Sequence, residues 1–264
     1  LDPAGGRLSL DGGGAVLRLP GLLEQDAIGL DRYDARIDWR RDQQLEVAIE
    51  RFGFENADAA GEVHGTWRAA AAGPGVVDLE ARLERADGTK AWRYLPLRLN
   101  ERARRWVRES IQAAAARDAR LRLRGDLADF PFVDPATGEF LVTASVASGR
   151  LAFDEDWPPI EAVEGRLRFE RASMTFDGDA SMFDLALRKI AARIDNLDKA
   201  VLRVEGRAEG PLADMVRVLA ESPLREQAGA GLERLRFTGP ASAGLRLELP
   251  ISDIDASRVE GSVR

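Results

Sequence analysis

The chain has 264 residues, a formal net charge of −7 and no cysteine, which excludes disulfides, thiolate nucleophiles and cysteine-based zinc sites. This length suits one large or two ordinary domains, and the acidic balance argues against a nucleic-acid binder, which needs a basic face. No stretch approaches the about 20 apolar residues of a membrane helix. Because Leu1 is not an initiator and no signal peptide is visible, we expect a piece of a longer chain.

Apolar and polar residues alternate along most of the chain, and this period of two is typical of strands with one buried face. Early in the sequence, Ile37 and Trp39 alternate with Asp38 and Arg40. Similar patterns follow near residues 45–49, 77–84, 121–123, 140–146, 151–153, 167–169, 174–176, 185–187, 202–204 and 245–247. Because short turns separate these segments, we expect successive strands to be antiparallel neighbours.

Two stretches depart from this alternation and predict short helices. From Asn100 to about Ala116, apolar residues recur at helical spacing, with Asn100 as the expected N-cap. A second helix is expected after Gly210-Pro211, with an apolar face and a last turn or two reaching Gly229. Two helices among many strands do not supply alternating βαβ units, so a doubly wound fold is disfavoured.

A weak internal repeat links two places where a strand is expected to end. The segment Leu123–Asp129 and the segment Glu209–Asp214 each carry a glycine followed by Leu-Ala-Asp. This similarity is compatible with a repeated supersecondary unit. Alternation alone leaves two architectures open, because sheets with one apolar face can close as a sandwich or curl into an open trough.

The inventory of reactive residues is poor, and we therefore expect no catalytic residue, no metal site and no cofactor. His64 is the only histidine, which leaves no second histidine for a metal and no clear catalytic partner. A second candidate is the acidic cluster Asp154, Glu155 and Asp156 beside Trp157, because carboxylates near an aromatic ring can bind sugar or calcium. Consecutive carboxylates on a strand point alternately to opposite sides, so a solvated turn is the favoured interpretation.

From residue 100 onward the chain resembles the large AsmA-like proteins, in particular those of the YhdP type. The order and spacing of several short blocks carry the resemblance, which covers about 160 residues. These blocks are Arg105-Trp106-Val107, Arg122–Gly125, Phe130-Pro131-Phe132, Gly138-Glu139-Phe140, Trp157–Ile160, Gly165–Phe169, Val204–Gly210 and Glu221–Leu224. Residues 1–98 share the strand pattern only, so we expect a first β segment over 1–98 and a second, helix-led segment over 99–264.

The resemblance implies a fold and a function that the strand pattern does not supply. It implies a mainly β protein with an elongated, curled antiparallel sheet, an apolar groove on its concave face and two short helices. It also implies a periplasmic part of an inner-membrane-anchored protein of a Gram-negative bacterium, with phospholipid as ligand and both membranes contacted by regions outside this chain. The family contributes no catalytic residues, and no nucleic-acid partner is expected.

Under this hypothesis the protein is a lipid conduit, in which phospholipid acyl chains lie on the apolar side of the strands between the inner and the outer membrane. The alternative is a scaffold or chaperone that pairs strands of outer-membrane proteins along a sheet edge. The predicted groove residues are the apolar members of the alternating segments: Ile37, Trp39, Val47, Ile49, Val77, Leu79, Leu83, Leu121, Leu123, Phe140, Val142, Val146, Leu167, Phe169, Leu202, Val204, Leu245 and Leu247.

Overall fold

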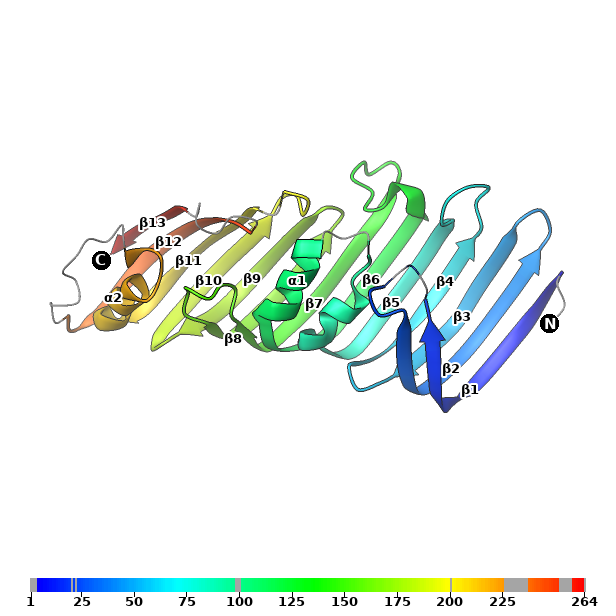
Figure 1. Ribbon diagram of the computed structural model, residues 1–264, viewed down its shortest axis with the longest axis horizontal. Helices are drawn as coiled ribbons and strands as arrows, with labels where there is room; N and C mark the ends of the chain where they lie inside the picture. The colour runs from blue at the N-terminus through cyan, green and yellow to red at the C-terminus, as the bar shows by residue number, and fades with distance from the viewer. Residues whose placement is uncertain are drawn as a thin grey trace. The chain divides into compact units, whose positions relative to one another are not determined.

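A computed structural model describes residues 4–19, 21, 23–97, 101–199, 201–225, 237–251 and 258–263, the last group and residue 103 without their side chains. Within this part of the chain, thirteen strands form one sheet whose order follows the sequence from β1 to β13 (Figure 1). The register is antiparallel from β1 to β5 and from β9 to β13. The predicted class, a mainly β chain with an antiparallel sheet and short helices, is confirmed.

The bounds of the elements show long strands joined by short turns. The strands are β1 (Gly5–Arg18), β2 (Ala27–Arg41), β3 (Leu45–Glu55), β4 (Ala59–Arg68), β5 (Val76–Asp87), β6 (Ile111–Asp126), β7 (Gly138–Leu151), β8 (Ile160–Glu170), β9 (Ser173–Met182), β10 (Leu185–Ile194), β11 (Val201–Pro211), β12 (Pro240–Pro250) and β13 (Arg258–Val263). Two α-helices, α1 (Glu101–Ser110) and α2 (Leu212–Ala220), and two 3-10 helices, η1 (Gly88–Tyr94) and η2 (Leu127–Asp129), complete the described elements.

The chain divides into two compact units, which are described separately. Unit 1 comprises residues 1–98, 116–144 and 168–172, and unit 2 comprises residues 99–115, 145–167 and 173–264.

In unit 1 the strand register gathers the apolar side chains on one face of the sheet. Residues that face each other on neighbouring strands point to the same side, so each line of paired residues across β1 to β5 forms a rung. Four consecutive rungs are mainly apolar: Gly6, Trp39, Val47, Trp67 and Val77; Leu8, Ile37, Ile49, Gly65 and Leu79; Leu10, Ala35, Phe52, Val63 and Ala81; and Gly12, Tyr33, Phe54, Gly61 and Leu83.

A β-bulge in β3 keeps the apolar residues of that strand on a single face. Ile49 pairs with Gly65, but Phe52 pairs with Val63, so β3 carries one residue more than β4 over this interval. The extra residue reverses the alternation. The apolar positions of β3 therefore change from odd numbers before the bulge to even numbers after it.

The opposite face of unit 1 carries exposed ion pairs. Arg7 bonds Asp38 at 2.7 Å and Glu50 at 3.1 Å, and Arg51 bonds Asp34 at 2.9 Å. Pairs of this kind in water each contribute under about 1 kcal/mol, so they favour solubility of this face more than they stabilise the fold.

A polar network holds η1 against the turns at one end of unit 1. The buried carboxylate of Asp58 accepts hydrogen bonds from Arg93 Nη1 at 2.5 Å and from the Tyr94 hydroxyl at 3.0 Å. Asn56 Nδ2 donates to the carbonyl oxygen of Gly29, and Arg93 Nε donates to Gln25. Burial raises the pKa of Tyr94 above its usual value, which keeps its hydroxyl available as a donor.

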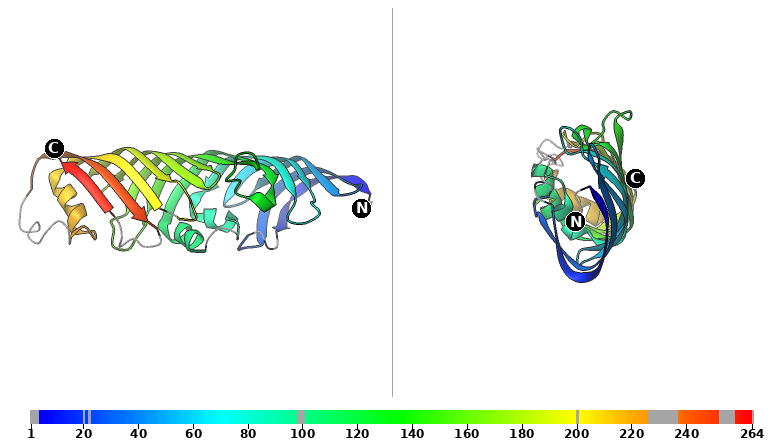
Figure 2. Two further views of the ribbon diagram at one scale, coloured as in Figure 1. Left: turned by 90° about the horizontal axis from the view of Figure 1, so that it is seen from above. Right: turned by 90° about the vertical axis from the view of Figure 1, so that its right-hand side faces the viewer.

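In unit 2 the same kind of apolar face is present, but α2 covers part of it. Three rungs run across β9 to β12: Met174, Ile194, Leu202 and Leu249; Phe176, Ala192, Val204 and Leu247; and Ala180, Leu187, Ala208 and Ala243. Met215 of α2 packs with Leu185, Ala208 and Ala243 in a buried cluster. Figure 2 shows α2 lying on one side of β11 and β12.

The repeated Leu-Ala-Asp segment has the same local structure in both places. Gly125 and Gly210 lie near the ends of β6 and β11 with φ angles of +132° and +154°, which favour glycine. A helical turn follows at once, η2 after the first and α2 after the second. Beyond η2, the fully buried Phe132 lies over Gly125 and Gly138, where any side chain would collide with its ring.

The first predicted helix is too long, whereas the start of the second agrees with the structure. α1 ends at Ser110, and the alanine-rich residues from Ile111 to Ala116 belong to β6. Alanine favours helix in isolation, but pairing of β6 between two other strands overrides this propensity. α2 begins at Leu212 as predicted, whereas Asn100 and the expected last turn at residues 226–229 lie outside the described residues.

Candidate functional site

The predicted groove residues on β2 to β5 lie together on the apolar face of unit 1. Ile37, Trp39, Val47, Ile49, Val77, Leu79 and Leu83 all belong to the four rungs. Only Val77 is buried, and the other six side chains are half-buried. In the core of a closed sandwich these side chains would be dry, so their partial exposure favours an uncovered sheet face.

Ion pairs locate the face on which the β6 and β7 residues of unit 1 lie. Arg122 bonds Asp78 on β5 and lies within 3.7 Å of Glu139 on β7, so these three side chains share the polar face. Leu121 and Leu123 alternate with Arg122, and Phe140 and Val142 alternate with Glu139 and Leu141. These four apolar side chains are half-buried and point to the side opposite the ion pairs. Phe169 of β8 is also half-buried.

Of the predicted residues of unit 2, Leu202, Val204 and Leu247 lie on rungs outside the cluster of Met215, whereas Leu245 packs against that cluster. Leu202, Val204 and Leu247 belong to the first two rungs, and Leu245 faces Gly206 on the neighbouring strand. Leu167 lies two residues after Gly165 and therefore on the same side of β8, and Gly165 lies against the Phe176 ring. All of these side chains, and Val146 on β7, are half-buried.

The structure adds large apolar residues that the prediction omitted. Phe52 and Phe54 stack with their ring centroids 6.0 Å apart on the face that also holds Val47. The signal for them is the change from odd to even apolar positions in β3, which marks the bulge. Trp67 completes the first rung, and Phe176 and Ile194 belong to rungs of unit 2.

Two tryptophans mark the end of the apolar face in unit 1. Of the four apolar rungs, the one that holds Trp39 and Trp67 is closest to the turns after β2 and β4. Trp67 Nε1 donates to the carbonyl oxygen of Pro74 at 2.9 Å, and the Trp39 ring lies over Gly6, where a Cβ atom would come within 2.5 Å of it. Both indoles therefore have fixed positions at the boundary between apolar and polar surface.

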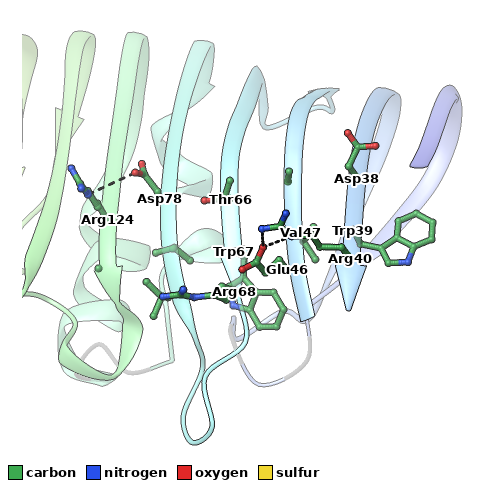
Figure 3. Close-up of a pocket in the computed structure, with 14 residues that line it drawn as sticks. Asp38, Trp39, Arg40, Glu46, Val47, Thr66, Trp67, Arg68, Asp78 and Arg124 are labelled. Carbon is green, nitrogen blue, oxygen red and sulfur yellow. Dashed lines mark hydrogen bonds and ion pairs between the residues drawn. The ribbon is translucent and has the colours of Figure 1, made fainter. Parts of the chain in front are cut away.

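A hollow of about 630 Å³ lies at these strand ends in unit 1 (Figure 3). Its lining combines the rung of Trp39, Val47, Trp67 and Val77 with charged side chains. These charged residues are Asp38, Arg40, Glu46, Arg68, Asp78 and Arg124, and the remaining lining residues are Ala48, Thr66, Val76 and Gly125.

His64 and the acidic residues Asp154 to Asp156, the candidates for catalysis or metal binding, form no catalytic or metal-binding arrangement among the described residues. His64 is exposed on the polar face of unit 1, with Nε2 3.3 Å from Glu80. Asp154 accepts a hydrogen bond from the backbone N–H of Asp156, an arrangement typical of a turn. Across the described residues, no three histidine or acidic side chains are grouped so as to hold a metal ion. None of the described helices has the length and apolar character needed to span a membrane.

The fold and this surface define a class of protein: an open antiparallel sheet with an ion-paired face on one side and a largely uncovered apolar face on the other. The chain belongs to the YhdP protein family, whose family model matches residues 1–264. This match confirms the YhdP-type resemblance of the sequence.

One characterised relative extends this assignment. The chain is 27% identical over 168 residues to the intermembrane phospholipid transporter YhdP of Escherichia coli (strain K12). The matched region is 63% of this chain but only 13% of that protein, so the chain corresponds to a small part of its relative. No solved structure matches the chain.

Proposed function

We propose that the chain is a segment of a lipid conduit, in which phospholipid acyl chains lie on the apolar faces of the sheet. The observation that carries the proposal is the set of four apolar rungs in unit 1, which share one face and whose large side chains, apart from the buried Val77, are half-buried or exposed. Membership of the YhdP family supports it, and so does the similarity to an intermembrane phospholipid transporter.

The driving force in this proposal is non-directional burial of hydrocarbon. Each methylene group that leaves water contributes about 0.8 kcal/mol, whichever rung it contacts. A ligand held in this way can move along the face, because neighbouring rungs offer similar surroundings. No catalytic group is needed, so the proposed activity is binding and transfer without a chemical step.

We further propose that this segment works in the periplasm of a Gram-negative bacterium, within a longer protein anchored in the inner membrane. Phospholipid would then pass between the inner and the outer membrane, with membrane contact made by regions outside this chain. The charged, ion-paired face of unit 1 is suited to an aqueous compartment.

A photoreactive amino acid placed on either face of one strand tests the proposal. Val47 lies on the apolar face of β3, and the adjacent Ala48 lies on the opposite face, paired with Thr66. In cells, the probe at position 47 should crosslink to phospholipid, and the probe at position 48, as the matched control, should not. Mass spectrometry of the crosslinked adduct identifies the ligand.

Two results would contradict the conduit. Equal lipid labelling from both positions would mean that labelling reflects the general surroundings. Crosslinks from position 47 to an outer-membrane protein in place of lipid would favour the scaffold or chaperone alternative.

A further inference from the structure

The three carboxylates that line the hollow at the strand ends of unit 1 are all paired with arginines. Asp38 bonds Arg7 at 2.7 Å, Glu46 bonds Arg40 with its Oε2 2.6 Å from Nε, and Asp78 bonds Arg122. The hydrogen bond from Arg7 lowers the pKa of Asp38, so this carboxylate stays ionised and paired at neutral pH.

Among the arginines that line the hollow, Arg68 has no carboxylate partner in the described part of the chain. It projects into the hollow from the end of β4, and its guanidinium is exposed. Thr66 lies two residues earlier on the same face of β4, about 7 Å away along the strand, and its exposed hydroxyl also lines the hollow. Because the acids are satisfied, the group that complements this hollow is an anion with several acceptor oxygens.

The apolar side of the same hollow identifies what the anion is attached to. Trp39 and Trp67 lie on the apolar rung closest to the turns, where the Trp39 ring packs over Gly6 and Trp67 Nε1 donates to the carbonyl oxygen of Pro74. Indole rings favour the boundary between hydrocarbon and water, because the ring is apolar and its N–H is polar. A ligand that fits both sides of this boundary carries a charged head beside Arg68 and a hydrocarbon part on the rungs.

We propose that this hollow binds the phosphodiester headgroup of a phospholipid, with Arg68 donating hydrogen bonds to the phosphate and the acyl chains starting on the rung of Trp39 and Trp67. The inference rests on the proposed lipid conduit and adds a headgroup subsite to it. A planar guanidinium can donate two parallel hydrogen bonds to phosphate oxygens, which makes arginine the suitable side chain for this role. In this proposal the hollow selects lipids by their headgroup, whereas the rungs bind acyl chains of any kind.

A competition between two lipids with identical acyl chains separates the subsite from the conduit. The 264-residue chain is incubated with vesicles containing equal amounts of phosphatidylethanolamine and diacylglycerol, then repurified, and the bound lipids are measured by mass spectrometry. The wild-type chain should retain phosphatidylethanolamine in preference to diacylglycerol. Arg68→Ala should lower this preference about tenfold, as expected for loss of a charge-assisted hydrogen bond, while total bound lipid stays within about twofold.

Two further variants control for charge and for geometry. Arg68→Lys keeps the charge but loses the two-pronged geometry, so it should recover only part of the preference. Arg36→Ala removes an exposed arginine from the same face of unit 1, on β2 and outside the hollow, and should leave the preference unchanged. An equal fall in both alanine variants would overturn the subsite, because it would reflect the charge of the whole face.

Three outcomes, two from the lipid assay and one from the lipid assay combined with a phosphate titration, overturn the subsite. If the wild-type chain retains both lipids equally, the conduit stands and the headgroup subsite fails. If it retains neither lipid, the proposed function fails together with the subsite. If inorganic phosphate titrated by calorimetry binds through Arg68 while the lipid preference does not depend on this residue, the site serves a free anion.

Discussion

The two units hold a short helix against the sheet in different ways: α2 in unit 2 by apolar packing, and η1 in unit 1 by hydrogen bonds and an ion pair. In unit 2, α2 inserts Met215 among Leu185, Ala208 and Ala243 and so occupies part of the apolar face. In unit 1, Arg93 and Tyr94 of η1 donate hydrogen bonds to Asp58, and Arg93 also donates to Gln25, both of them residues of the turns between strands. Most of the large rung residues of unit 1 stay half-buried or exposed, whereas Ala35 and Val77 are buried.

The two units also differ in the size of the residues on their apolar faces. The rung beneath α2 has Ala180, Ala208 and Ala243 at three of its four positions, which leaves room for the helix. The rungs of unit 1 carry phenylalanine, tryptophan, isoleucine and leucine, together with glycines and two alanines, Ala35 and Ala81. The rung with three alanines is thus the rung on which α2 packs, and the rungs of unit 1 offer large side chains that another apolar molecule can contact.

The largest expected effect is for a charge placed on each kind of surface. Met215→Asp buries an unpaired carboxylate in the cluster under α2 and should destabilise unit 2 by about 3–5 kcal/mol. Val142→Asp places the same charge on a half-buried position of unit 1, where water can reach it when lipid is absent. This variant should lose bound phospholipid while its free energy of unfolding in urea falls by only about 1 kcal/mol.

Comparable destabilisation by the two aspartates would break the comparison, because Val142 would then behave as ordinary core. Unchanged lipid content of Val142→Asp would show that this position lies off the lipid path.

Enlarging an alanine should distinguish covered from uncovered rungs. Ala208 is buried beneath α2, so Ala208→Leu overpacks the cluster and should cost about 2 kcal/mol of unfolding free energy. Ala192 lies on the uncovered rung of Phe176 and Val204, and Ala192→Leu should cost under about 0.5 kcal/mol. Urea unfolding of both variants measures the difference, and equal costs would mean that the second rung is covered as well.

The hydrogen bonds that hold η1 in unit 1 should depend on the carboxylate of Asp58. Asp58→Asn removes the charge that Arg93 and the Tyr94 hydroxyl share and should destabilise unit 1 by about 2 kcal/mol. Glu46→Gln breaks the exposed pair with Arg40 and should cost under about 1 kcal/mol. If the two variants unfold at the same urea concentration, the network around Asp58 does not hold η1.

The smallest expected effect is a dependence on alkaline pH. Burial raises the pKa of Tyr94, so its neutral form is favoured in the folded state. This contribution to stability is complete below the ordinary tyrosine value of 10.0 and is lost as pH rises through the higher folded pKa. Tyr94→Phe should remove this decline from the urea unfolding curve of unit 1 above about pH 10. Tyr33, the other tyrosine, provides the matched control as Tyr33→Phe.

Local sequence patterns were sufficient for the strands and for most of the apolar face. A period of two decides which side a residue faces as long as no bulge intervenes, which is why Ile37, Trp39 and Val47 were placed together. Phe52 and Phe54 were missed because the bulge in β3 reverses the pattern, and the pairing partner that defines a bulge lies on another strand.

Features that depend on distant partners escaped the sequence reading. The 3-10 helix η1 is fixed by Asp58, about 35 residues earlier in the chain, and no local motif announces that contact. The segment from Ile111 to Ala116 has good helix propensity, and only its place between two strands makes it part of β6. The hollow beside Arg68 likewise combines residues from β2 to β6, so charge pairing across strands had to be known first.

The strand order has a consequence for how the protein forms. Because each described strand pairs with its neighbours in sequence, a new strand can dock on the edge that has just been completed, and few long loops must close. Folding can therefore keep pace with a chain that emerges from one end. A hairpin of two strands can also be gained or lost without reversing the direction of the strands that follow, so a sheet of this kind can change its length in evolution by whole hairpins.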